Sequence, residues 1–203
     1  ALLSLGTMQV MLVFAAYIQS PQWTLVGLGL SATAAGLSKL PSNVVALVAG
    51  PLAGHLSART GTRPIAVAGM LLTAIGWFAS MALPTGLGEV ILLLCVITFG
   101  SSMLNAAIYL VLVEAVPSQR TGEAIGMTAV FRGISTAIGA QIVVVLLAND
   151  TLTTPSGAQL PSATGYLLGM AWIGGVSLLG AVLALLLRRV AKPPQPAVAN
   201  SPA

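Results

Sequence analysis

Six long apolar stretches fill most of this 203-residue chain and constrain its fold more than any other feature. A helix needs about 20 mostly apolar residues to cross the ~30 Å hydrocarbon core of a membrane. Hydrophobic residues make up 57% of the chain and charged residues 6%, whereas a soluble domain carries about 25% charged residues. Lipid must therefore be the outer solvent. We predict six transmembrane helices, at Leu2–Gln19, Gly36–Leu56, Ile65–Leu83, Val90–Val113, Glu123–Ala148 and Gly165–Leu187.

The same stretches predict the fold class and the domain organisation. They are too long for the strands of a membrane β-barrel and lack the alternation of such strands. We therefore predict an all-α membrane protein in which residues 1–187 form one six-span bundle. Residues 188–203 form a polar segment containing Pro and Ala, for which we predict a disordered cytoplasmic tail.

The basic residues predict the orientation of the bundle. They lie in the connections after the second and fourth spans and after the sixth span, at Arg59, Arg63, Arg120, Arg188, Arg189 and Lys192. The other three connections contain no Lys or Arg: Ser20–Ala35, Pro84–Glu89 and Asn149–Thr164. By the positive-inside rule, both termini of the chain face the cytoplasm, and an even number of spans requires the same. We expect the plasma (inner) membrane as the location.

Composition and motifs argue against several other classes of function. The net charge is +4, but the positive residues sit at membrane edges and not on one solvated face, so we expect no nucleic-acid partner. With one cysteine, Cys95, and one histidine, His55, the chain has too few ligands for a metal or haem site, and we expect no cofactor. Hydrolase elbows, zinc-protease motifs and phosphate-binding loops are missing, so we predict no catalytic residues and no enzyme activity.

The connection between the second and third spans carries a specific motif. Residues 54–63 read Gly-His-Leu-Ser-Ala-Arg-Thr-Gly-Thr-Arg. In so tight a turn, Gly61 is expected to adopt a positive φ, and Gly54 is expected to permit a close backbone approach. Arg59 and Arg63 are expected to donate hydrogen bonds to the last carbonyls of the second span.

This motif resembles the signature loop of the major facilitator superfamily, Gly-x-Leu-Ala-Asp-Arg-x-Gly-Arg-Lys. The matching positions are Gly54, Leu56, Arg59, Gly61 and Arg63, whereas Ala58 replaces the usual Asp and Thr62 the usual Arg. Residues 36–41, 50–54, 116–124, 131–134 and 137–139 resemble the drug-efflux branches of that superfamily. The resemblance implies the C-terminal six-helix half of a multidrug efflux antiporter, built from two inverted three-helix repeats and paired with an N-terminal six-helix half.

Polar residues divide the spans into two groups. The third and sixth spans carry only weakly polar residues in their middles and can face lipid all round. The other four spans carry amide, phenol and guanidinium groups, which are costly in hydrocarbon and normally face protein or a watery cavity. We predict that these groups line a substrate pathway: Gln9, Asn43, Asn105, Tyr109, Arg132 and Gln141. The superfamily fold implies the same division, with the third helix of each repeat outside.

Arg132 is the strongest candidate, because it lies about 13 Å into the fifth span when counted from Glu123. Its guanidinium is expected to face the cavity, to pair with a carboxylate, or to reach back to the cytoplasmic interface. The acidic residues all lie at span ends, and we predict a charge pair between Glu114 and Arg120 there. A proton carrier in the centre of the membrane would then belong to the N-terminal half.

Three functions remain open from the sequence. The first is proton-coupled drug efflux by alternating access, and the second is import or uniport of a polar or anionic metabolite. The third is a six-span assembly subunit that transports nothing. Because Ala1 leads directly into apolar sequence, without an initiator Met or a signal peptide, we expect a fragment of a longer polypeptide. Its expected partners are the lipid bilayer, a small-molecule substrate and the N-terminal half.

Overall fold

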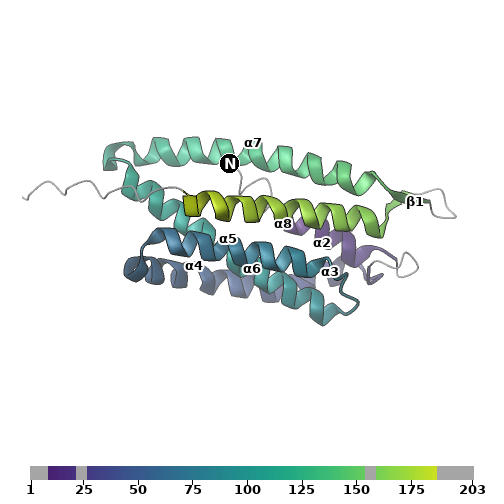
Figure 1. Ribbon diagram of the computed structural model, residues 1–203. Helices are drawn as coiled ribbons and strands as arrows, with labels where there is room; N and C mark the ends of the chain where they lie inside the picture. Colours follow the sequence, from purple (N-terminus) through teal and green to yellow (C-terminus); the bar gives the residue numbers. More distant parts are fainter. Residues whose placement is uncertain (1–8, 22–26, 154–158, 187–203) are drawn as a thin grey trace, which may run out of the picture.

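The chain forms a bundle of helices that run along one long axis (Figure 1). The computed structural model describes residues 9–21, 27–153 and 159–186. In chain order, the elements are α2 (Val10–Gln19), α3 (Ala32–Ser38), α4 (Leu40–Thr60), α5 (Thr62–Ser80), α6 (Leu87–Ala115), the 3₁₀ helix η2 (Ser118–Arg120), α7 (Thr121–Ala148), β1 (Thr151–Thr153), β2 (Gln159–Pro161) and α8 (Ala163–Leu186). The predicted all-α class is confirmed, apart from one short pair of strands.

Helices stand at the positions of all six predicted apolar stretches. Among the described helices, α5, α6, α7 and α8 are long and apolar enough to cross a membrane. With 21 residues α4 is also long enough but less apolar, and α2 has ten residues in the described part of the chain. Six crossings therefore stay a prediction, and the predicted tail, residues 188–203, lies outside the described residues.

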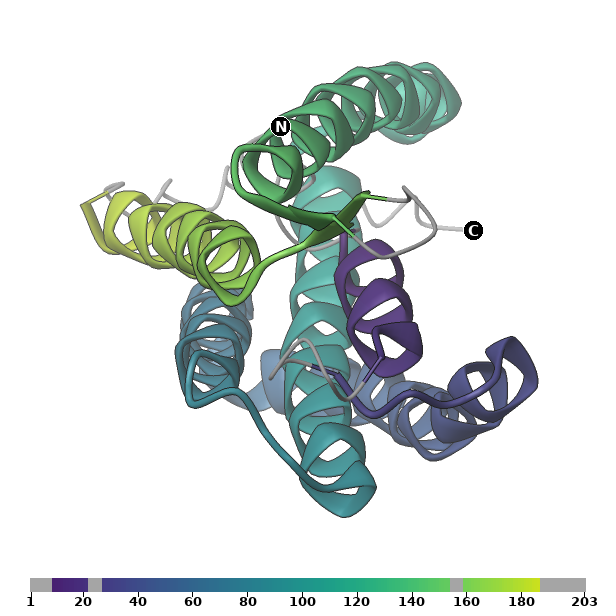
Figure 2. The same ribbon diagram turned by 90° about the vertical axis from the view of Figure 1, so that its right-hand side faces the viewer.

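The connections that carry arginines gather at one end of the bundle. The α4–α5 turn, η2 and the end of α8 lie together at that end, and the α5–α6 connection and the strands lie at the other (Figure 1). Arg59, Arg63 and Arg120 thus share one end, although which side of a membrane this end faces stays a prediction. Viewed along the axis, α6 lies in the centre and α7 at the periphery (Figure 2).

Gly61 makes the tight turn between α4 and α5. Its φ is +89°, and its N–H donates a hydrogen bond to the Ser57 carbonyl at 2.9 Å. The expected positive φ is confirmed, and it favours glycine because a side chain would be strained there. The expectation of a close backbone approach at Gly54 is wrong, because a Cβ on this residue would meet no atom within 4 Å.

The close backbone approach occurs instead where α5 crosses α6. A Cβ on Gly69 would lie 2.7 Å from the Gly100 carbonyl oxygen, and a Cβ on Gly100 would lie 2.6 Å from the Gly69 carbonyl oxygen. Such contacts between small residues give membrane helices their packing energy. Along this face of α5, Thr73, Trp77 and Ser80 have no exposed surface. The expectation that the third span faces lipid all round is therefore wrong, and α8 likewise buries one face, against α5.

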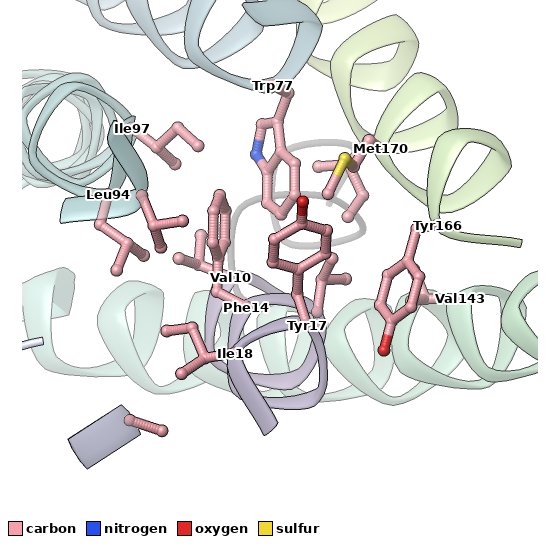
Figure 3. Close-up of a cluster of buried hydrophobic side chains, with 14 of the residues drawn as sticks. Val10, Phe14, Tyr17, Ile18, Trp77, Leu94, Ile97, Val143, Tyr166 and Met170 are labelled. Atoms are coloured by element: carbon pink, nitrogen blue, oxygen red, sulfur yellow. The ribbon is translucent and has the colours of Figure 1, made fainter. Parts of the chain in front are cut away.

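Aromatic side chains join α2 to α5 and α8 in the largest buried cluster (Figure 3). The Phe14 ring lies 5.5 Å from the Trp77 ring, and Tyr17 meets Tyr166 edge to face at 5.4 Å. The Tyr17 hydroxyl donates to the Pro84 carbonyl at 2.9 Å. The rings thus pack in the core while this hydroxyl has an acceptor, as buried tyrosines require.

The connection between α7 and α8 contains the only strands in the described part of the chain. β1 and β2 pair antiparallel, with Leu152 opposite Leu160. The Ser162 hydroxyl donates to the Asp150 carboxylate at 2.7 Å and accepts the Gly165 N–H at 3.3 Å. Ser162 therefore caps the first turn of α8 and connects it to the end of α7.

A proline interrupts the hydrogen bonding of α4. Pro51 has no N–H, so the Leu47 carbonyl lacks its usual helical donor. Asn43, Leu47, Pro51 and His55 follow one another at four-residue spacing, and all four are exposed. They share one face of α4, which does not pack against the described part of this chain.

Candidate functional site

Arg132 lies near the middle of α7. It is eleven positions after Thr121, where α7 begins, so the helix rise of ~1.5 Å per residue places it about 16 Å from that end. This is roughly half of a ~30 Å hydrocarbon core. A guanidinium at this depth costs about 2.5–3.5 kcal/mol on insertion scales unless protein groups receive it.

Two side chains of α6 receive the guanidinium. Its Nη2 donates to Asn105 Oδ1 at 2.6 Å, and its Nη1 donates to the Tyr109 hydroxyl at 3.1 Å. The guanidinium carbon also lies 5.7 Å from the centre of the Tyr109 ring, within the range of a cation–π contact. The Asn105 amide nitrogen donates to the Ser101 carbonyl at 2.8 Å, which fixes its oxygen toward Arg132.

These residues belong to a polar seam between α6 and α7. We use this name for two rows at four-residue spacing, Ser101, Asn105 and Tyr109 on α6 and Thr128, Arg132 and Thr136 on α7. Residues four apart share one helix face, and all members except the exposed Tyr109 are half-buried. The buried Gln9, directly before α2, joins the seam through its Nε2, which donates to the Thr136 carbonyl at 3.0 Å.

The structure brings together four of the six residues predicted for the substrate pathway. Asn105, Tyr109 and Arg132 are in direct contact, and Gln9 reaches the same helix one turn away. Asn43 on α4 and Gln141 on α7 are exposed and do not join them.

Sequence reasoning missed Ser101, Thr128 and Thr136. Each hydroxyl is a weak signal by itself in a membrane helix, because it can bond to the backbone of its own helix. Their four-residue spacing from Asn105 and Arg132 was the usable signal.

The seam is rich in donors and poor in negative charge. The whole chain has four acidic residues, Glu89, Glu114, Glu123 and Asp150. They lie in the first or last turns of helices or just beyond, and within the described residues no ion pair joins one of them to Arg132. The arrangement therefore holds a positive charge at mid-helix depth, and no described residue supplies a counter-charge.

The predicted charge pair at the end of α6 does not form in the described part of the chain. Glu114 and Arg120 are both exposed, and neither a hydrogen bond nor an ion pair joins them. Pro117 and the 3₁₀ turn of η2 stand between them, and two solvated side chains gain little from pairing.

Arg63 binds to α8 and not to α4. Its Nε donates to the Ala184 carbonyl at 2.9 Å, and its Nη2 donates to the Leu185 carbonyl. Sequence reasoning placed Arg59 and Arg63 on the carbonyls of the second span. That expectation is wrong for Arg63, because the start of α5 lies beside the last turn of α8, where carbonyls lack helical donors. Arg59 is exposed.

We predict that Arg63→Ala loosens the end of α8. The substitution removes two charge-assisted hydrogen bonds, which are worth about 1.5–3 kcal/mol each when well formed and less at a half-exposed site. Amide hydrogen exchange in a peptide covering residues 178–186 should become faster, while exchange in α6 stays unchanged. Arg59→Ala is the matched control, and equal exchange in the two variants would contradict the assigned role of Arg63.

The sequence was compared with known proteins. The sequence profile of the Major Facilitator Superfamily matches residues 1–203. Over 125 residues, the chain is 26% identical to a protein of Bacillus subtilis (strain 168) described as the uncharacterized MFS-type transporter YhcA. The match covers 61% of this chain and 24% of that protein, so the chain spans about a quarter of its relative.

Proposed function

Because this chain belongs to the Major Facilitator Superfamily, we propose that it is the C-terminal six-helix half of a membrane transporter for small molecules. In this proposal, the half rocks against an N-terminal half and exposes a site near the membrane centre to each side in turn. The loop of residues 54–63 and its place at the α4–α5 turn support the proposal.

One observation carries most of the proposal, namely the polar seam with Arg132. A buried or mid-membrane charge is expensive and normally serves a substrate or ion pathway. Asn105 and Tyr109 hold the guanidinium in place instead of letting it reach the interface. A six-span assembly subunit would gain nothing from this arrangement, since apolar packing would hold α6 against α7 at lower cost.

We further propose that transport is efflux driven by protons. The segments that resemble drug-efflux branches support this direction, and they include residues 131–134 around Arg132 itself. A proton carrier needs a carboxylate or a histidine within the membrane. Since the acidic residues of this chain lie at helix ends, we assign the carrier to the N-terminal half.

Ethidium retention tests the proposed function. Cells that lack their own efflux pumps and express the complete transporter should expel ethidium, and a protonophore should stop the expulsion. Asn105→Leu removes the acceptor that orients Arg132, and we expect efflux to fall roughly tenfold. Asn149→Leu makes the same substitution at the exposed end of α7 and should leave efflux near the wild-type rate.

A second candidate function follows from the same charge. A guanidinium at mid-helix depth without an ion-pair partner among the described residues suits an anionic metabolite better than a cationic drug. Import or uniport of such a metabolite is therefore the alternative. Uptake of labelled organic acids by the same cells, without ethidium efflux, would favour this alternative. If the complete protein transports neither ethidium nor organic acids in either direction, the result would favour the interpretation as a six-span assembly subunit.

A further inference from the structure

We propose that Arg132, together with Tyr109, forms a binding site for one carboxylate group. The proposal rests on the transport function above and deepens it, because it names the chemical group that the seam binds. Asn105 acts as a positioning residue for the guanidinium. The carboxylate belongs either to a substrate or to an acidic side chain in the remainder of the transporter.

Hydrogen-bond capacity is the first argument. A guanidinium has five N–H donors in a fixed plane. Two of them are used, by Asn105 Oδ1 and by the Tyr109 oxygen, and three have no acceptor in the described part of the chain. The Tyr109 oxygen accepts from Arg132, so its own O–H remains available as a further donor. The site offers several donors side by side, and a carboxylate is an acceptor-only group that matches such a fork.

Charge is the second argument. Along α7, Glu123 is nine positions from Arg132, or about 13 Å at the rise of an α-helix. On α6, Glu114 is five positions beyond Tyr109, toward the same end of the bundle. Asp150 follows the far end of α7, and Glu89 lies in the first turn of α6. Because the chain has no other acidic residue, a counter-charge for Arg132 would come from another molecule or from another part of the transporter.

The exposure of the site and the single positive charge it offers both favour a ligand with one negative charge. Arg132 is half-buried and Tyr109 is 42% exposed, so the guanidinium is open on one side of this bundle. Arg132 is the only basic residue within α7, and Arg120 precedes the start of that helix. A phosphate dianion would need a second cation, whereas a single carboxylate is neutralised by one guanidinium. The exposed Tyr109 ring beside the cation also offers an apolar surface to the body of an organic acid.

Benzoate is a suitable probe, since it carries one carboxylate on an aromatic ring. We expect sodium benzoate to raise the unfolding temperature of the purified complete transporter with saturation, whereas benzamide, its uncharged counterpart, should not. Arg132→Gln should weaken the apparent affinity for benzoate by roughly tenfold or more. Arg120→Gln removes an exposed arginine at a helix end and should bind benzoate like the wild type.

A second comparison identifies the source of the carboxylate. If an acidic side chain of the transporter already occupies the site, benzoate has no effect on the wild type, Arg132→Gln lowers the unfolding temperature without ligand, and Arg132→Lys largely restores it. A carboxylate site is supported either by this pattern or by saturable stabilisation of the wild type by benzoate. The proposal is wrong if benzoate stabilises Arg132→Gln as much as the wild type. It is also wrong if benzoate has no effect and the Gln and Lys variants unfold alike. Ethidium efflux is measured separately, so failure of this site leaves the proposed function standing.

Discussion

Gly100→Leu is expected to abolish the folded bundle. A Cβ on Gly100 would lie 2.6 Å from the Gly69 carbonyl oxygen and 2.8 Å from the Thr73 backbone nitrogen. Overpacking costs about 1–3 kcal/mol when neighbouring side chains can shift. Here the neighbours are backbone atoms of α5, so the two helices must separate and lose contact along their lengths. After mild solubilisation, fluorescence-detected size-exclusion chromatography should show no monodisperse peak.

Gly88→Leu is the matched control for this prediction. Gly88 lies in the first turn of α6, is exposed, and has no atom within 4 Å of the position its Cβ would take. The same side chain on the same helix should therefore leave the elution profile unchanged. A monodisperse Gly100→Leu variant would show that α5 and α6 do not cross at these glycines.

Among substitutions that truncate a side chain to Ala, Trp77→Ala is expected to cause the largest loss of stability. Trp77 has no exposed surface, and its ring packs against Phe14 of α2. Truncation of a buried Trp or Phe to Ala typically costs about 3–5 kcal/mol, because a cavity remains and contacts are lost. The unfolding temperature of the purified protein should fall far below that of the wild type, and α2 should become more open to hydrogen exchange.

Two variants separate the packing of Trp77 from its polar group. Trp172 on α8 is 37% exposed, so Trp172→Ala should cost much less than Trp77→Ala. Trp77→Phe keeps an aromatic ring and removes an indole N–H that has no hydrogen-bond partner among the described residues. Relief of that unsatisfied donor offsets part of the lost packing, so we expect only a small change. If Trp77→Phe is as damaging as Trp77→Ala, the indole N–H has a partner that matters.

Hydropathy predicted where α5 to α8 lie, because each apolar stretch must satisfy its own backbone within one helix. It did not predict the separate helix α3, so the predicted second span, Gly36–Leu56, begins inside α3, whereas α4 begins at Leu40. Predicted and observed limits differ by a few residues for α5 to α8, since hydropathy does not register capping groups such as Ser162. Arg132 could also be identified from the sequence, because a charge within an apolar stretch is visible without knowledge of its partners. Its contacts with Asn105 and Tyr109 were not predicted individually.

Contacts between distant segments could not be predicted. Gly69 and Gly100 meet because α5 and α6 cross there, and neither residue differs in sequence from glycines such as Gly50 and Gly54, which face open space. Arg63 lies in the first turn of α5, directly after the end of α4, yet it binds to α8, which is far away in sequence. Small-residue spacing and basic loops indicate that contacts exist, but which surfaces meet depends on how the helices cross.

The proline in α4 affects how this bundle meets its surroundings. The Leu47 carbonyl lacks its helical donor, and the face on which it lies also carries Asn43 and His55. Acyl chains offer no hydrogen bonds, so a lipid annulus would leave this carbonyl and the Asn43 amide unsolvated. We therefore expect water or further polypeptide to cover this side of α4. The exposed leucines and valines of α8 need no such cover, which gives the bundle a lipid side and a non-lipid side.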